Sequence, residues 1–195
     1  MKKRSMSISI DFFITEAGAA YVYLNDGGPV IFKHIGLEYG AVTRPETKAG
    51  SFRLYKALKE VHEVENPNDV PSDFLRIEFK TPQDDSKPLR GKFPRAAYQA
   101  GENFQQVQFE NGQIRVTRLA CGKATCEVAA NLAEPSLLVA LSSVTVKTAA
   151  HGAKKLALGE TSWLEPGAKA ELQNSSGVLA EQLRIEFKAK PVKIK

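Results

Sequence analysis

The sequence contains one short segment twice, and this repeat limits the folds open to the chain more than any other feature. Leu-Arg-Ile-Glu-Phe-Lys occupies residues 75–80 and returns unchanged at residues 183–188. The shift of 108 residues between the two copies also aligns Asn66 with Asn174 and needs no gap. A repeat of this kind indicates that the chain holds two copies of one structural unit.

The repeated hexamer alternates apolar and charged residues. Successive side chains of a β-strand project to opposite faces, so Leu, Ile and Phe share one face and Arg, Glu and Lys share the other. We expect a half-buried strand whose charged face is solvated or paired with neighbouring strands. The Arg and Glu are also a candidate catalytic pair, but a solvated strand face explains them without any chemistry.

The repeat also decides between helix and strand for residues 53–65. Taken alone, this segment predicts a helix, because it has good helix formers and apolar residues at helical spacing. The aligned segment at residues 161–173 carries Pro166 and Gly167 in its middle, and proline breaks a helix. Both segments are therefore predicted to form strand, turn and strand.

The rest of the chain also has a β pattern. Asn111-Gly112 is the strongest short hairpin signal, and residues 25–28 and Ser142-Ser143 are further turn signals. Short apolar runs flank these turns: 21–24 with 30–32, 107–109 with 114–116, and 137–141 with 144–147. Many short strands separated by Gly, Asn and Pro predict an all-β sandwich or jelly roll.

We predict a first unit at residues 1–81, a linker at residues 82–101 that is rich in Pro, Asp and Lys, and a second unit at residues 102–195. Only 20 residues precede Tyr21, where the first clear strand begins, so the first unit is expected to be incomplete. Residues 6–14 have the pattern of a strand buried on both faces. The open sheet edge would be covered by the second unit or by another chain, and we predict a homodimer.

Two segments carry a resemblance to a known family. Residues 159–174 combine Gly159, a Pro-Gly turn and a closing Asn174, and resemble the second conserved motif of the cupin superfamily. Residues 59–66 resemble the same motif in the first unit. The chain therefore resembles a bicupin over residues 20–80 and 104–188. The resemblance implies an all-β fold of two tandem double-stranded β-helix (jelly-roll) barrels.

The metal-binding motifs of the second unit depart from the cupin pattern. A metal-binding cupin is expected to carry two His and a Glu in its first motif and one His in its second. Here Ala170 stands at the second-motif position, and residues 126–134 contain no His where the first motif is expected. Glu127 and Glu134 alone make a poor transition-metal site. The resemblance therefore predicts no metal and no cofactor.

The first unit departs differently. His62 stands where the second-motif histidine belongs, but the first-motif loop is reduced to residues 15–18, which leaves no room for His-x-His. His34 and His151 fall outside the ligand positions of the pattern. His62 is thus the one candidate ligand-binding residue. The alternative is that His62 is an ordinary hydrogen-bonded histidine.

Two cysteines, Cys121 and Cys126, are separated by four residues. They have no second pair and no nearby His, which is too little for a zinc site. In a cytosolic protein we expect two buried thiols, and a disulfide only in an exported one.

Charge and hydropathy exclude two classes of partner. The net charge is +5, but the lysines are scattered apart from a concentration in the tail, without stacking aromatic residues, so no nucleic-acid partner is predicted. No apolar run is long enough for a membrane span. Lys2-Lys3-Arg4 resembles the start of a signal peptide, but Asp11 and Glu16 interrupt the apolar stretch. A cytoplasmic location is therefore predicted, the alternative being an exported protein whose leader has been removed.

Three functions are consistent with the sequence. The first is a non-catalytic cupin-like module that binds a small molecule or has a structural role. The second is a metal-dependent enzyme of the dioxygenase or isomerase type that uses His62, and the third is an interaction protein. Aromatic residues are the candidate lining of a ligand-binding barrel: Tyr21, Tyr23, Phe32, Tyr55 and Trp163.

Overall fold

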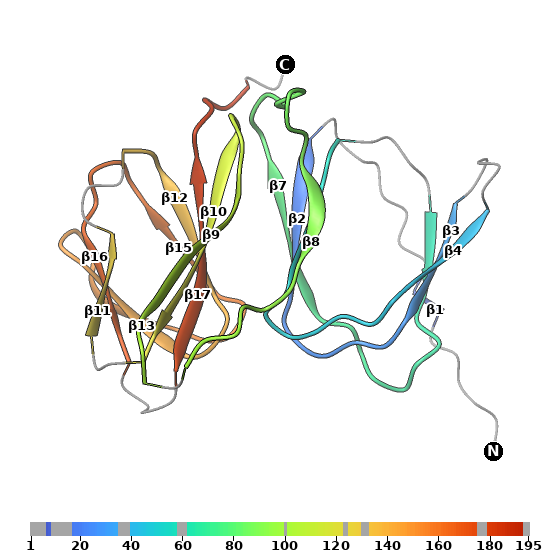
Figure 1. Ribbon diagram of the computed structural model, residues 1–195, viewed down its shortest axis with the longest axis horizontal. Helices are drawn as coiled ribbons and strands as arrows, with labels where there is room; N and C mark the ends of the chain where they lie inside the picture. Colours follow the sequence, from blue (N-terminus) through green and yellow to red (C-terminus); the bar gives the residue numbers. More distant parts are fainter. Residues whose placement is uncertain are drawn as a thin grey trace. The chain divides into compact units, whose positions relative to one another are not determined.

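The described part of the chain is built from strands (Figure 1). In this computed structural model we describe residues 7–8, 17–34, 40–57, 62–99, 101–122, 125–129, 133–174 and 179–192, with backbone alone at 7–8 and 127–129. Every regular element in these ranges is a β-strand, which confirms the predicted all-β class. The same ranges hold no helix that has the length and hydrophobicity to cross a membrane.

The chain forms two compact units, which we describe separately. Unit 1 comprises residues 1–83 and 89–95, and unit 2 comprises residues 84–88 and 96–195. Residues 82–101, expected to be a linker, are thus divided between the units. They include β8 (Arg90–Phe93), which pairs with β5 (Phe52–Tyr55) of unit 1. The Pro, Asp and Lys content of the segment did not reveal this short strand.

Unit 1 consists of two four-stranded sheets. The first has the order β7 (Phe74–Phe79), β2 (Gly18–Tyr23), β5 and β8. The second has the order β1 (Ser7–Ile8), β6 (His62–Glu65), β3 (Val30–His34) and β4 (Ala41–Arg44). Strand β1 pairs with β6 of its own unit, so this edge is covered within the chain. The homodimer stays a prediction.

Unit 2 has a five-stranded and a four-stranded sheet. The larger has the order β15 (Thr161–Leu164), β12 (Ser136–Ala140), β17 (Ala180–Phe187), β10 (Ile114–Cys121) and β9 (Phe104–Glu110). The smaller has the order β11 (Thr125–Ala129), β16 (Ala170–Gln173), β13 (Val144–Thr148) and β14 (Gly152–Leu156).

The strand order repeats between the units, as the sequence repeat predicted. The order β7-β2-β5 in unit 1 corresponds to β17-β12-β15 in unit 2, and β1-β6-β3-β4 corresponds to β11-β16-β13-β14. Unit 2 adds β9 and β10 beyond β17, whereas the described part of unit 1 has no strand beyond β7 and adds β8 beyond β5. Within its described residues, unit 1 therefore has no counterpart of β9 and β10.

The strand prediction for residues 53–65 and 161–173 is confirmed where the structure describes them. β5 and β6 occupy the two ends of the first segment, while residues 58–61 lie outside the described residues. β15 and β16 occupy the second segment, and Gly167 between them has a φ of 77°. Glycine adopts this left-handed conformation without the strain that a Cβ atom causes.

The hairpin predicted at Asn111-Gly112 forms, whereas the other two turn signals do not join paired strands. Asn111 Oδ1 accepts hydrogen bonds from the main-chain N–H groups of Gln113 (2.9 Å) and Ile114 (2.8 Å), which closes the β9–β10 hairpin. The strands on either side of residues 25–28 and of residues 142–143 lie in different sheets. These turn residues reverse the chain, but the pairing of the strands depends on partners that are distant in sequence.

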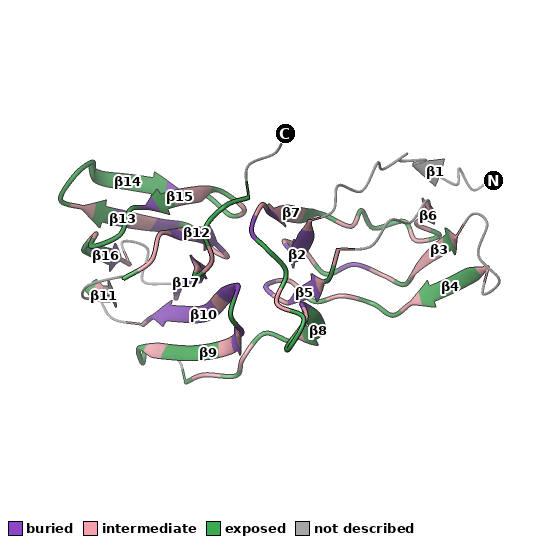
Figure 2. Ribbon diagram, turned by 90° about the horizontal axis from the view of Figure 1, so that it is seen from above, coloured by how far each residue is buried: buried purple, intermediate pink, exposed green. Residues whose placement is uncertain are grey.

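The charged face of the repeated hexamer is not solvated in unit 2. Arg184 and Glu186 are only 5% and 6% exposed, and β17 is buried on both faces (Figure 2). The register with β10 places Arg184 beside Thr117 and Ala180 beside Cys121, on one face of the sheet. Cys121 belongs to the core cluster that includes residues of the opposite sheet. Because Ala180 and Cys121 are part of this core, the charged face on which they lie points between the sheets. The other face of β17 is buried as well.

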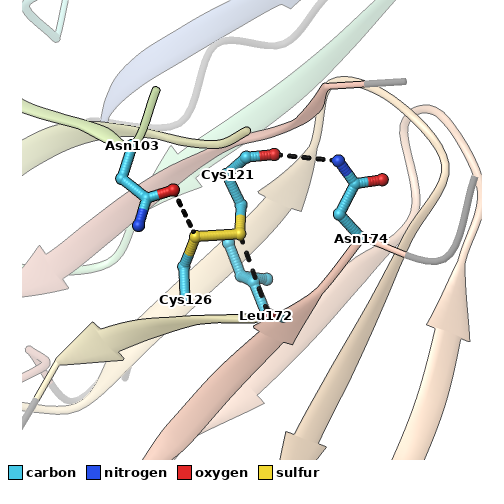
Figure 3. Close-up of a disulfide and its surroundings, with 5 residues drawn as sticks. All are labelled: Asn103, Cys121, Cys126, Leu172 and Asn174. Atoms are coloured by element: carbon cyan, nitrogen blue, oxygen red, sulfur yellow. Dashed lines mark hydrogen bonds between the residues drawn. A yellow bond between two sulfur atoms is a disulfide. The ribbon is translucent and has the colours of Figure 1, made fainter. Parts of the chain in front are cut away.

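The cysteines form a disulfide, contrary to the expectation of two thiols (Figure 3). Cys121 ends β10 in the larger sheet and Cys126 lies at the start of β11 in the smaller sheet, with Cα atoms 5.7 Å apart. This separation is typical of disulfides. Asn174, the closing residue of the motif, donates a 3.1 Å hydrogen bond from Nδ2 to the Cys121 carbonyl. The strand ends thus converge at a place that residue spacing alone did not indicate.

Candidate ligand-binding site

The first half of the candidate site is one face of the β7-β2-β5-β8 sheet of unit 1. Along β2, Tyr21 and Tyr23 alternate with Ala20 and Val22, so the two tyrosines share a face. In register, Tyr21 lies between Arg53 of β5 and Arg76 of β7. The charged side of the repeated strand therefore stands beside the tyrosines.

The second half comes from the opposite sheet. Arg44, at the end of β4, donates a hydrogen bond from Nη1 to the Tyr55 hydroxyl. Its guanidinium carbon lies 3.8 Å from the centroid of the Phe32 ring and 5.0 Å from that of the Tyr55 ring. Because Tyr55 belongs to the other sheet, these side chains meet between the two sheets. We call the following set the interior cluster of unit 1: Tyr21, Tyr23, Phe32, His34, Arg44, Arg53, Tyr55, His62, Phe74 and Arg76.

His62, the residue singled out from the sequence, is part of this cluster and has a histidine neighbour. His34 lies directly opposite His62 in the β3–β6 pair, and the two ring centroids are 5.9 Å apart. The Phe32 ring lies 5.1 Å from the His62 ring. His34 Nδ1 is 3.2 Å from the Gly40 carbonyl oxygen. Sequence reasoning missed His34 because cross-strand register, and not a cupin ligand position, brings it here.

Four of the five aromatic residues expected to line a barrel meet in the cluster. The Tyr21 ring contacts Tyr55 edge-on, with centroids 5.2 Å apart, and Phe74 at 5.4 Å. Tyr23 lies 6.4 Å from Phe74. Trp163 is in unit 2, is 47% exposed and contacts Phe187, so it has no part in the site.

The cluster contains more cationic than anionic groups. Arg76 forms an ion pair with Glu78 at 2.8 Å, and Glu78 also pairs with Lys80 at 2.9 Å. Within the described residues no carboxylate lies within 4 Å of Arg44 or Arg53. Arg53 is only 6% exposed. Two guanidiniums between the sheets thus lack a carboxylate partner in the part of the chain that is described.

Tyr21 and Tyr23 remain protonated at neutral pH. Burial raises the pKa of Tyr23 to about 12, although the nearby Arg53 and Arg44 guanidiniums oppose the shift. Burial also raises the pKa of Tyr21, against the effect of Arg76. Both hydroxyls are therefore neutral hydrogen-bonding groups that do not cancel the positive charge.

The interior of unit 2 contains far more aliphatic side chains, although Gln182, Arg184 and Glu186 on the polar face of β17 also point into it. Its core cluster is aliphatic and draws on both sheets: Leu119, Cys121, Leu138, Ala140, Val144, Val146, Leu156, Leu164, Ala170, Leu172 and Ala180. A cavity of about 300 Å³ opens beside the disulfide and is lined by residues that include Asn103, Gln105, Leu119, Cys126 and Leu172. Asn103 Oδ1 lies 2.9 Å from the Cys126 sulfur at its edge.

The described side chains do not fit a transition-metal centre. Ala170, at the second-motif position, is buried in the apolar core and has no ligand atom. The Glu127 side chain lies outside the described residues, and Glu134 comes shortly after residues 130–132, which are also outside them. Across the described ranges, no group of three or more His, Cys, Asp or Glu side chains has metal-binding geometry. His34 and His62 therefore supply two imidazoles without a third described ligand.

Comparisons with known proteins identify the fold. No family model matches the sequence, and no curated protein is similar to it. Among solved structures, a cupin 2 conserved barrel domain protein from Leptotrichia buccalis is similar with a TM-score of 0.60 at 12% identity, over 94% of this chain and 80% of the other. AerE from Microcystis aeruginosa has a TM-score of 0.53 at 10% identity, over 93% and 82%.

Oxalate decarboxylase from Bacillus subtilis is also similar, with a TM-score of 0.54 at 8% identity, over 96% of this chain and 67% of the other. Identities at this level show a shared fold and not a shared activity. The resemblance noted in residues 159–174 and 59–66 agrees with these similarities. Together with the repeated two-sheet units, they show that the chain has the all-β, cupin-type barrel fold.

Proposed function

We propose that the protein is a non-catalytic, small-molecule-binding protein of the cupin fold and that unit 1 binds the ligand between its two sheets. One observation carries the proposal. The side chains between the sheets of unit 1 are largely tyrosine, arginine and histidine, whereas in unit 2 an aliphatic cluster occupies much of the corresponding space, beside the buried polar face of β17.

The energetics of burial support this division of roles. Aliphatic side chains fill a barrel whose task is stability, because their burial is favourable and leaves no polar atom unsatisfied. Polar and charged side chains cost free energy in an interior unless partners satisfy them. A few convergent polar groups among aromatic rings are typical of ligand sites. The interior cluster of unit 1 matches that description, and the aliphatic cluster of unit 2 favours a structural role for that unit.

The chemistry of the cluster favours binding over catalysis. A general acid or base works best when its pKa lies near the working pH. Burial moves the pKa of Tyr23 to about 12, far from neutrality. Arg44 donates to Tyr55, and an arginine side chain stays protonated, so this pair orients a ligand without exchanging a proton with it.

Nuclear magnetic resonance of the full chain tests the proposal. His and Tyr rings are labelled with ¹³C, and the protein is titrated with aromatic fragments that include phenol, benzamide and benzoate. We expect the ring signals of His34, His62 and Tyr21 to shift, while the indole signal of Trp163 in unit 2 stays in place. If every fragment leaves the unit 1 rings unchanged, or if only the cavity beside Cys126 responds, the proposed site is wrong.

A metal-dependent enzyme of the dioxygenase or isomerase type, using His62, is the second candidate. The direct apposition of His34 and His62 favours it, since it places two imidazoles on one face. Elemental analysis of protein purified without a metal-binding tag separates the two candidates. Near-stoichiometric Fe, Mn, Ni or Zn that is lost in His62→Ala would replace the non-catalytic proposal by this one.

A further inference from the structure

We infer that the ligand of unit 1 is a small aromatic carboxylate and that Arg44 and Arg53 bind its carboxylate group. This inference rests on the proposed function, and it adds the chemical class of the ligand. It follows from the charge balance between the sheets, from the comparison with a buried arginine in unit 2, and from the aromatic rings around the two guanidiniums.

Arg118 shows how the same chain treats a buried guanidinium that has a structural role. It is fully buried in unit 2 and forms an ion pair with Glu181 at 2.5 Å. Its Nε donates to Gln108 Oε1 at 2.9 Å, and the Tyr98 hydroxyl donates to Glu181 at 2.6 Å. Buried charges in proteins are normally paired and hydrogen-bonded in this way.

Arg53 is buried to nearly the same degree but has no such partner among the residues that the structure describes. It is 6% exposed, and its guanidinium carbon lies 5.7 Å from the Tyr23 ring centroid. No carboxylate of the described ranges is within ion-pair distance of it. Its direct cross-strand neighbour is Tyr21 of β2, so it lies on the face that points between the sheets. Burying a cation without an anionic partner costs free energy, and an anion that enters the interior would offset this cost.

Arg44 approaches the same space from the opposite sheet. A guanidinium has five N–H donors in a planar fork, and the described contacts of Arg44 assign one nitrogen, Nη1, to the Tyr55 hydroxyl. Among the described residues, the guanidiniums of Arg44, Arg53 and Arg76 therefore stand with one carboxylate, that of Glu78, which already pairs with Arg76. The described part of the interior thus has an excess of positive charge that is complementary to an anion.

The groups around Arg44 and Arg53 define the rest of the ligand. Guanidiniums bind both carboxylates and phosphates through paired N–H donors, so charge alone does not distinguish the two. The guanidinium carbon of Arg44 lies 3.8 Å from the Phe32 ring centroid and 5.0 Å from that of Tyr55. The Tyr21 ring extends this aromatic surface, with its centroid 5.2 Å from that of Tyr55 and 5.4 Å from that of Phe74. Such rings favour a flat aromatic body with offset or edge-on packing. A carboxylate on an aromatic ring satisfies both requirements.

Isothermal titration calorimetry of the full chain tests the inferred chemical class of the ligand with three probes. Benzoate carries the ring and the charge, benzamide carries the ring without the charge, and inorganic phosphate carries charge without a ring. We expect benzoate to bind at least about tenfold more tightly than benzamide, since charge-assisted hydrogen bonds are lost with the charge. Phosphate is expected to bind more weakly than benzoate.

Variants assign the binding to the two arginines. Arg44→Met and Arg53→Met are each expected to weaken benzoate binding by about tenfold or more and to leave benzamide binding unchanged. Lys48→Met, which removes an exposed charge of the same unit, is the matched control and should bind benzoate normally. Circular dichroism establishes that each variant is folded. The comparison of benzoate with benzamide on the unaltered protein does not depend on any variant.

Three results would overturn the inference. Equal affinity for benzoate and benzamide would exclude an anionic ligand while leaving small-molecule binding in unit 1 intact. Tighter binding of phosphate than of benzoate would replace the aromatic carboxylate by a simple oxyanion. If benzoate does not bind while neutral fragments shift the ring signals of unit 1, the ligand is not a carboxylate but the proposed binding function stands. If no fragment binds, the proposed function is wrong as well.

Discussion

Arg44 donates a hydrogen bond to the hydroxyl of Tyr55 and thereby joins the two sheets of unit 1. The same guanidinium packs on the Phe32 ring of its own sheet. A single arginine thus links the two sheets and, with Arg53, supplies the charge on which the inferred ligand class depends.

Loss of this hydrogen bond should weaken unit 1. Tyr55→Phe keeps the ring and removes the hydroxyl, so we expect the free energy of unfolding to fall by about 1.5 kcal/mol, as for other bonds to charged groups. Urea denaturation followed by circular dichroism measures the change. Tyr21→Phe is the matched control, because the Tyr21 hydroxyl makes no hydrogen bond within the described residues, and it should change stability by less than about 0.5 kcal/mol. Equal losses in both variants would contradict the structural role of the bond.

Arg53→Met and Arg118→Met should have opposite effects in ligand-free protein. Replacing Arg53 removes a buried cation without a described carboxylate partner, and we expect a gain of roughly 1 kcal/mol in stability. Replacing Arg118 leaves Glu181 buried without its cation, and we expect a loss of about 3 kcal/mol. Chemical denaturation measures both. A loss with Arg53→Met as large as that with Arg118→Met would mean that Arg53 has a structural partner.

The disulfide should stabilise unit 2 in particular. Closing so short a loop contributes about 2 kcal/mol in the chain-entropy description. We expect the double variant Cys121→Ser, Cys126→Ser to unfold at a lower urea concentration than the unaltered protein. The fluorescence of Trp163, the one tryptophan of the chain, measures the unfolding. A reducing agent should destabilise the unaltered protein and leave the double variant unaffected. Alkylation of both cysteines in protein kept free of reductant would show that the bond is absent.

Glu110 should give unit 2 part of its acid sensitivity. Hydrogen bonds from Arg115 and then Lys188 lower the pKa of Glu110 from 4.5 to about 2. A lowered folded-state pKa means that the contribution is complete above about pH 4.5 and is lost as the pH falls toward 2. Because the carboxylate is partly exposed, solvent screens the pairs and the effect is small.

Glu110→Gln should therefore show a smaller loss of stability than the unaltered protein between pH 4.5 and pH 2. Denaturation followed through Trp163 fluorescence at a series of pH values measures this. Glu171→Gln, at an exposed position of β16, is the control and should keep the original pH dependence. An unchanged pH profile in Glu110→Gln would show that the pairs with Arg115 and Lys188 contribute nothing in solution.

Much of the fold could be predicted from residues that are close together in the sequence. The alternation in residues 75–80 and 183–188 predicted two equivalent strands, and Asn111-Gly112 predicted a hairpin. The alignment of Pro166 with residues 53–65 excluded a helix that local propensity favoured. These signals are local or arise from the repeat itself, so they needed no knowledge of which strands pair.

The candidate site was predicted only in part, because its members come from separate strands. His62 and four aromatic residues were identified from motif and composition, but His34, Arg44 and Arg53 were not. His34 becomes a neighbour of His62 through the β3–β6 register, and Arg44 meets Tyr55 only after the two sheets face each other. The cysteine pairing depends in the same way on β10 and β11 ending side by side.

The sequence by itself determined that the chain is all-β, that its unit is repeated, and that its motifs resemble those of cupins. Only the tertiary structure decided which side of the repeated strand points between the sheets. Periodicity shows that Arg184 and Leu183 lie on opposite faces, but it does not say what covers each face. In unit 2 both faces are buried, and the charged one faces the barrel interior. Sheet closure brings together residues that are distant in sequence, and no local pattern encodes that contact.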